Sequence, residues 1–166
     1  MNAYARGALA GAAAGLIGGA AMAAGTKVEQ AATGRPNSYV PARTVAHLLG
    51  LSDPDSDRWT RNMLMHYMAG ATAGAVRGVM AAANLRGPLA SLMHAPLRLS
   101  LDQTLENATG VGAPPWTWPR DELVVDMGAK TLYALVTGAV ADALVEPASK
   151  SSVRRAALGS RRKGFA

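Results

Sequence analysis

The chain has 166 residues, a net charge of +6, no Cys and a single Phe. This length suits one domain, and the absence of Cys excludes a disulfide framework and a thiolate metal site. So few aromatic residues would make a poor large soluble core. Hydrophobic residues make up 49% of the chain, although the mean hydropathy is only +0.08. A membrane protein rich in small residues fits this composition.

The first expected element is an uncharged run over residues 7–25, long enough to cross a hydrocarbon core of about 30 Å. Glycines recur in it every four residues, which places them on one helix face. Small residues on a common face let helices approach closely in lipid. The run therefore predicts a transmembrane helix with a glycine-zipper face made of Gly7, Gly11, Gly15 and Gly19. Arg6 and the small residues around Met22 leave a cleavable signal sequence as the alternative.

Residues 63–83 form the second expected transmembrane helix, after a polar loop and a short helix near residues 44–51. The helix repeats the four-residue spacing at Gly70, Gly74 and Gly78. It also carries two ionisable residues, His66 and Arg77. Polar groups at membrane depth are expensive, so these two are candidates for function or for a structural pair.

Residues 89–106 show leucines at steps of three and four with polar residues between them. This pattern predicts an amphipathic helix lying on the membrane surface or on the bundle, bent or broken around Pro96. The charges of Arg86, His94 and Arg98 argue against a crossing here.

The third expected crossing covers residues 123–145 and carries Asp126, Lys130 and Asp142. These charges share one helical stripe with two small residues, Ala134 and Gly138. A single charged stripe can face the interior of a bundle while the leucines and valines face lipid. We therefore predict an all-α membrane bundle of about three transmembrane helices and one interfacial helix.

The membrane domain is expected to cover residues 1–149, followed by a basic tail over residues 150–166. Of the 17 basic residues, six lie in the tail, five in residues 27–62 and three in residues 83–122. The positive-inside rule then places the first loop and the tail in the cytoplasm, and the N-terminus and the Trp-rich loop outside. The tail is expected to bind anionic lipid rather than nucleic acid.

This topology predicts which charged groups meet. Arg77 and Lys130 come to one depth with Asp126 as their available anion, whereas His66 and Asp142 come together on the inner side. An imidazole beside a carboxylate can relay protons near neutral pH. Structural pairs that fix helix register are the alternative interpretation for both groups.

Three tryptophans, Trp59, Trp116 and Trp118, precede apolar runs and are expected to anchor the protein at the lipid headgroups. A binding or enzymatic site around Trp116, Trp118, Arg120, Asp121 and Glu122 is a further hypothesis. His47, His66 and His94 show no metal-ligand spacing, and the chain has no phosphate loop, dinucleotide fingerprint or Gly-x-Ser-x-Gly motif. No catalytic residue, metal or cofactor is expected.

The order of short motifs carries one resemblance. Gly25–Glu29 ends the first helix, Pro41–Arg43 follows, and His66–Tyr67 opens the second glycine-rich helix before a loop rich in Pro and Trp. In this order the chain resembles the YagU-like bacterial inner-membrane proteins, although these have a longer and more aromatic middle section. The resemblance implies a helical inner-membrane protein and supplies no activity.

Because thin, glycine-faced helices bury little surface by themselves, a partner subunit or a second copy is expected to fill their grooves. The sequence therefore predicts a non-enzymatic subunit, assembly factor or scaffold of a membrane complex. The alternative is a small oligomeric channel or proton-coupled transporter lined by Arg77, Lys130, Asp142 and His66.

Overall fold

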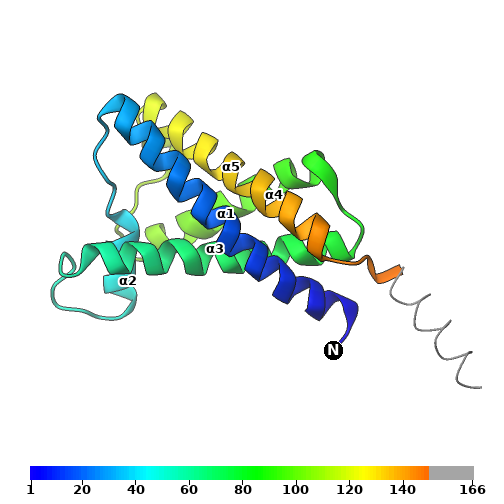
Figure 1. The fold of residues 1–166 in the computed structure, drawn as a ribbon. Helices are drawn as coiled ribbons and strands as arrows, with labels where there is room; N and C mark the ends of the chain where they lie inside the picture. Colours follow the sequence, from blue (N-terminus) through cyan, green and yellow to red (C-terminus); the bar gives the residue numbers. More distant parts are fainter. Residues whose placement is uncertain (150–166) are drawn as a thin grey trace, which may run out of the picture.

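The computed structural model describes residues 1–149 and is all-α over that range, as the sequence predicts (Figure 1). Its elements are five α-helices and a short 3-10 helix, η1, with no strand in the described part of the chain. Their bounds are α1 Ala3–Thr33, α2 Val40–Leu48, α3 Arg58–Ala82, α4 Gly87–Ala108, η1 Pro115–Thr117 and α5 Arg120–Leu144. The predicted basic tail, residues 150–166, lies outside the described residues.

The long helices α1, α3, α4 and α5 alternate in direction (Figure 1). Ala10 of α1 packs against Ala81, Ala82 and Val145, so the N-terminus, the turn between α3 and α4 and the end of α5 share one end of the molecule. We name this the terminal end. The α1–α2 connection, the end of α4 and the Pro- and Trp-rich loop before α5 converge at the opposite end, which we name the loop end.

This arrangement corrects the predicted topology. The first loop and the Trp-rich loop were expected on opposite sides, yet residues of both meet at the loop end. The N-terminus and the end of α5, also expected on opposite sides, both lie at the terminal end (Figure 1). The reason is α4, which runs back along the bundle as one helix and so adds a pass that the prediction omitted. Pro96 lies inside α4 without ending it.

Local sequence signals explain where the helices begin and end. The Asn2 side chain accepts a hydrogen bond from the amide of Ala5 at 2.8 Å, which caps the N-terminus of α1. Gly34 ends α1 in the left-handed conformation, with φ of 74°. Asn84 and Gly87, with φ of 67° and 81°, reverse the chain between α3 and α4. Between the caps Asn2 and Gly34, α1 extends eight residues beyond the apolar run, to Thr33.

The glycines of α1 and α3 face each other across an antiparallel contact. A Cβ added to Gly11 would lie 2.6 Å from the Cα of Gly78, and one added to Gly74 would lie 2.6 Å from the Cα of Gly15. At the ends of the same contact, a Cβ on Gly7 would lie 2.8 Å from the carbonyl oxygen of Gly78. The two backbones therefore touch, and each glycine face is covered by the other within one chain.

α5 packs against α1 and α4 through other small residues. A Cβ on Gly18 would lie 2.9 Å from the carbonyl oxygen of Tyr133, and one on Gly138 would lie 2.9 Å from the Cβ of Ser91. Gly18 is outside the four-residue series predicted for α1, whose last member, Gly19, has only ordinary contacts with Tyr67. α1 therefore uses two faces, one for α3 and one for α5.

Two of the described helices, α1 and α5, are long and apolar enough to cross a membrane. The second expected crossing, residues 63–83, falls in α3, which does not reach that hydropathy. Arg58, Arg61, His66 and Arg77 all lie in α3 and lower its apolar character.

Candidate functional site

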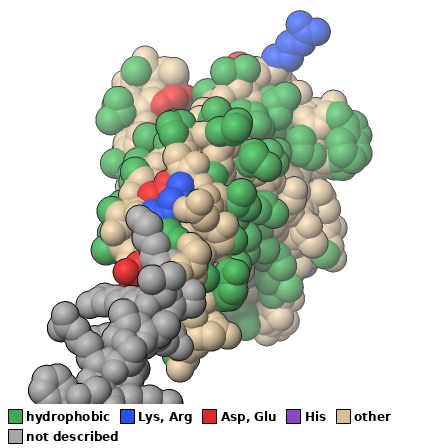
Figure 2. Space-filling model, turned by 90° about the vertical axis from the view of Figure 1, so that its right-hand side faces the viewer, with side chains coloured by type: hydrophobic (Ala, Val, Ile, Leu, Met, Phe, Trp, Pro, Cys, Tyr) green, Lys and Arg blue, Asp and Glu red, His purple; other side chains and the backbone are tan. Residues whose placement is uncertain are grey.

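The interior of the molecule holds several charged side chains among small apolar residues, and much of its surface is apolar. Among the fully or almost fully buried side chains are those of Arg77, which is 0% exposed, and His94, Arg98 and Lys130. The outward positions of α1, α3, α4 and α5 carry large hydrophobic side chains, which also cover much of the face in Figure 2. They include Leu9, Leu16, Ile17, Leu64, Met68, Val76, Val79, Leu89, Leu92, Met93, Leu97, Leu132 and Leu135. This distribution is the reverse of that in a water-soluble bundle.

α4 shows the reversal most clearly. Leu89 is 71% exposed and Met93 is 62% exposed, whereas His94, Arg98 and Asp102 on the opposite face are buried. The sequence predicted an amphipathic helix here. The structure places its polar face inside the bundle against α3 and α5 rather than toward water.

At the terminal end, Asp142 of α5 joins three helices. Its carboxylate accepts hydrogen bonds from Nη2 of Arg77 at 2.9 Å and from the amide of Gly87 at 2.8 Å. Arg86 donates to the backbone oxygen of Asp142 at 2.6 Å and also to that of Val145. Asp142 thus neutralises the buried Arg77 and caps the N-terminus of α4.

The expected pair of His66 and Asp142 does not form. His66 instead makes a hydrogen bond of 2.7 Å from Nε2 to the carbonyl oxygen of Gly19, on α1. Asp142 was expected near His66 because three crossings would have brought the end of α5 to the start of α3. In the structure Asp142 pairs with Arg77, nearer the other end of α3.

The middle of the bundle holds a second histidine. His94 Nε2 bonds to the carbonyl oxygen of Ala73 at 2.8 Å, and its ring lies 5.8 Å from that of the buried Tyr133. The Tyr133 hydroxyl donates to the carbonyl oxygen of Gly70 at 2.6 Å. The Tyr133 ring also lies 5.0 Å beneath the guanidinium of Arg98. These bonds hold α3, α4 and α5 together through backbone carbonyls of α3.

Closer to the loop end, two buried cations are paired with two carboxylates. Arg98 donates from Nε to Asp102 at 3.0 Å, and the Lys130 ammonium lies 3.5 Å from the same carboxylate. Lys130 also forms an ion pair with Asp126, one turn earlier in α5. The sequence named Asp126 as an anion for both Lys130 and Arg77, but only Lys130 reaches it.

Beside this cluster lies a cavity of about 550 Å³. Helices α1, α3, α4 and α5, the α1–α2 connection and the Trp-rich loop all contribute to its wall. Its charged lining residues are Lys27, Arg35, Arg98, Asp102, Glu106, Glu122, Asp126 and Lys130. Met22, Met63, Val125 and Trp118 supply apolar surface. Cavities of this size, with apolar walls and a few polar groups, are typical of small-molecule sites.

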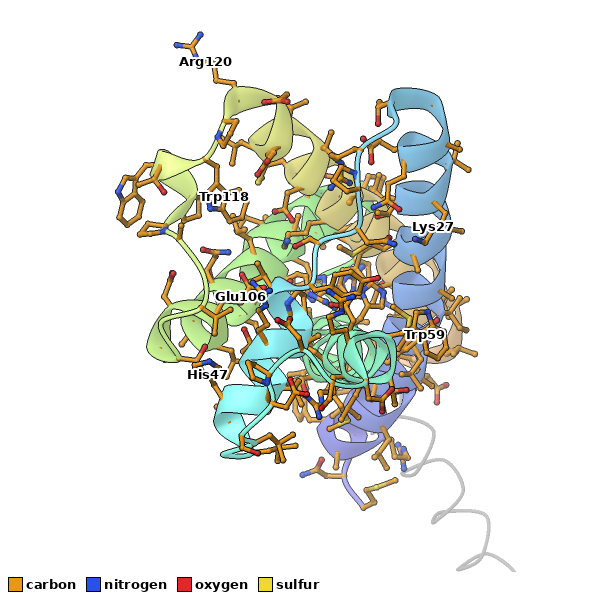
Figure 3. All side chains as sticks on the ribbon, turned by 90° about the vertical axis from the view of Figure 1, so that its left-hand side faces the viewer. Lys27, His47, Trp59, Glu106, Trp118 and Arg120 are labelled. Carbon is orange, nitrogen blue, oxygen red and sulfur yellow. The ribbon has the colours of Figure 1, made fainter. Side chains whose placement is uncertain are left out.

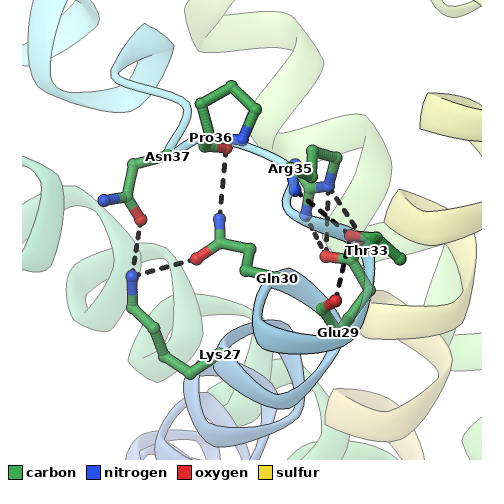
Figure 4. Close-up of polar contacts among 7 residues, drawn as sticks. All are labelled: Lys27, Glu29, Gln30, Thr33, Arg35, Pro36 and Asn37. Carbon is green, nitrogen blue, oxygen red and sulfur yellow. Dashed lines mark hydrogen bonds and ion pairs between the residues drawn. The ribbon is translucent and has the colours of Figure 1, made fainter.

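One rim of the cavity is held by the connection after α1 (Figure 4). Lys27 donates to the side chain of Gln30 at 3.0 Å and also to that of Asn37. Arg35 forms an ion pair of 2.6 Å with Glu29. The hydrogen bond with the Glu29 carboxylate raises the pKa of the Arg35 guanidinium above its ordinary value. Both cations are thereby tied to the end of α1.

The predicted aromatic anchors lie in different surroundings. Trp59 is exposed at the start of α3, and Trp116 is exposed in η1. Trp118 is half-buried, lines the cavity and donates to the carbonyl oxygen of Ala113 at 2.7 Å. Arg120 points away from the molecule (Figure 3), so it does not join Trp118 in the predicted interfacial site. Glu122 does line the cavity.

Sequence reasoning missed the acidic and amide side chains of α4, namely Asp102, Gln103 and Glu106. Their spacing of three and four residues places them on the face of His94 and Arg98, so the signal was present.

No group of three or more His, Asp or Glu side chains within residues 1–149 is arranged to hold a metal ion. The chain matches no protein-family model, no curated protein and no solved structure.

Proposed function

We propose that this chain is a multi-pass integral membrane protein that binds a small molecule in its cavity, as a carrier or a ligand-binding subunit and not as an enzyme. The observation that carries the proposal is the reversed polarity: charged side chains surround an internal cavity, while large apolar side chains cover the outside of four helices. In lipid this arrangement is favourable, because the bilayer replaces water as the outer solvent.

Two features support a membrane-embedded bundle that includes α3 and α4. The buried arginines of these helices are paired inside the protein, Arg77 with Asp142 and Arg98 with Asp102, and the outward positions of both helices carry large apolar side chains. α1 supplies the packing surface for both α3 and α5, which favours a retained helix over a cleaved signal. The resemblance to the YagU-like family stays a prediction that agrees with this location.

The assembly role predicted from the sequence depended on open glycine grooves. Gly11 and Gly15 are covered by Gly74 and Gly78 of the same chain, so a glycine zipper, if it operates in lipid, joins α1 to α3 and not to a partner. We therefore base the proposed function on the cavity. The proposed orientation keeps the basic tail cytoplasmic at the inner membrane, and the cavity then opens at the outer face.

Cysteine accessibility tests this proposal, because the chain has no native Cys. Gln103→Cys places a thiol in the cavity wall, and Ser91→Cys is a matched control on the same helix, buried outside the cavity. In alkali-washed membranes we expect a small water-soluble thiosulfonate to modify Gln103→Cys and to leave Ser91→Cys unmodified. Loss of the protein in the alkaline wash, or no reaction at Gln103→Cys, would contradict the proposal.

A further inference from the structure

We propose that the cavity at the loop end binds an organic cation, with its positive charge beside Glu106 and its apolar part against Trp118 and the methionines of the wall. This inference rests on the proposed function, since it names the ligand class of the same cavity. It depends on which of the charged residues that line the cavity already have an ion-pair partner.

Glu106 is a buried carboxylate for which residues 1–149 supply no ion-pair partner. The residue is 9% exposed and lines the cavity in the last turn of α4. One carboxylate oxygen accepts a hydrogen bond of 3.1 Å from Nε2 of Gln103, which is uncharged. Within residues 1–149 no ion pair to Glu106 is formed, so this buried carboxylate lacks the compensating charge that such groups require.

Three of the four cations that line the cavity are already paired with carboxylates. Lys130 contacts both Asp102 and Asp126, and Arg98 contacts Asp102, so two buried cations serve two carboxylates before Glu106 is counted. Arg35 is paired with Glu29. An anionic ligand would have to displace one of these carboxylates, whereas a cationic ligand would complete the pairing.

The fourth lining cation, Lys27, has no acidic partner within residues 1–149. It donates hydrogen bonds to the uncharged side chains of Gln30 and Asn37. Its side chain is exposed at the rim (Figure 3), where water already stabilises the charge. Glu106, which is 9% exposed, has much less solvation than Lys27. The stronger demand for an opposite charge is therefore at Glu106.

The rest of the wall indicates what kind of cation fits. No set of three or more His, Asp or Glu in the described chain could hold a metal ion, and one carboxylate suits a monovalent charge. Trp118 offers an aromatic ring, which attracts cations, and Met22 and Met63 offer flexible apolar contacts. These residues favour a cation that carries hydrocarbon or aromatic groups.

Two probes of the same shape and opposite charge test the inference: tetraphenylphosphonium and tetraphenylborate. Their binding to the purified full-length protein in detergent is measured by equilibrium dialysis, with empty micelles as the blank. We expect the phosphonium to bind at least about tenfold more tightly than the borate, as one additional ion pair would give. Glu106→Gln should remove that preference and weaken phosphonium binding by about the same factor.

The control variant is Asp121→Asn, which removes an exposed carboxylate from the start of α5 outside the cavity wall. It should bind both probes as the wild type does. Glu106→Gln should unfold at the same temperature as wild type, which shows that its loss of phosphonium binding does not come from unfolding. Equal binding of the two probes, or full phosphonium binding by Glu106→Gln, would overturn the inference. If neither probe exceeds the blank while Gln103→Cys is labelled, the cation inference is wrong and the cavity proposal stands.

Discussion

Substitution of Gly74 by alanine tests the close packing of α1 against α3. A Cβ at Gly74 would lie 2.6 Å from the Cα and 2.8 Å from the amide nitrogen of Gly15. Favourable carbon–carbon contacts are about 3.5–4.0 Å, so the two backbones would have to separate by about 1 Å. Both atoms belong to a helix backbone and cannot rotate away.

Two opposing effects set the expected magnitude. Overpacking of this kind costs about 1–3 kcal/mol, and separation of the helices also loosens neighbouring contacts. The higher helix propensity of alanine returns at most about 1 kcal/mol. We therefore expect Gly74→Ala to lower the free energy of unfolding by up to about 2 kcal/mol relative to wild type, and by about 1–3 kcal/mol relative to a helical Gly→Ala variant that has no clash.

Gly128→Ala is the matched control. Gly128 is helical and exposed in α5, and a Cβ there would have no neighbour within 4 Å. This variant gains the helix propensity of alanine without the clash, so its unfolding free energy should equal or exceed that of wild type. Equilibrium unfolding of both variants in one mixed-micelle system provides the measurement. A Gly74→Ala protein as stable as Gly128→Ala would refute the packing argument.

The remaining predictions concern charge. Asp142→Asn should destabilise the protein by about 3 kcal/mol because it leaves the buried Arg77 uncompensated, whereas His66→Leu removes one hydrogen bond and should cost about 1 kcal/mol. This order reverses the one expected if the two residues were partners, and thermal unfolding of the pair decides it. Lys130→Met should also cost about 3 kcal/mol, since it strips two carboxylates of a cation; an unfolding curve that coincides with wild type would rule out the ion pairs. Leu92→Lys places a charge on the outward face of α4 and should reduce the membrane-inserted fraction in a fractionation assay; unchanged insertion would argue against lipid at that face.

Much of the fold follows from the sequence because charge-free runs and glycine periods are local signals. The run at residues 7–25 lies within α1, and the stripe containing Lys130, Ala134 and Gly138 lies inside the bundle. The pairing of charges could not be predicted in the same way. It depends on how many times the chain passes through the bundle, and the sequence predicts α4 on the membrane surface or on the bundle, not as one of its passes.

α4 shows why that error arose. The spacing of Leu89, Leu92, Met93 and Leu97 defines an apolar face, but periodicity alone cannot say whether that face meets a protein core or lipid. The face turns out to be exposed, and the polar face of His94, Arg98 and Asp102 is inside. With α4 crossing the bundle, Asp142 moves from His66 to Arg77, and the first loop and the Trp-rich loop come to the same end.

The central claim is tested most directly by measuring whether lipid or water contacts the outer face of the helices. The Cys-free chain allows single nitroxide labels at Leu16, Met93 and His47, all of which are exposed. In reconstituted bilayers, spin relaxation by oxygen reports lipid and relaxation by a nickel chelate reports water. We predict that oxygen dominates at Leu16 and Met93 and that the nickel chelate dominates at His47, near the loop end. Dominant nickel relaxation at Leu16 and Met93 would contradict a lipid-facing bundle with a polar interior.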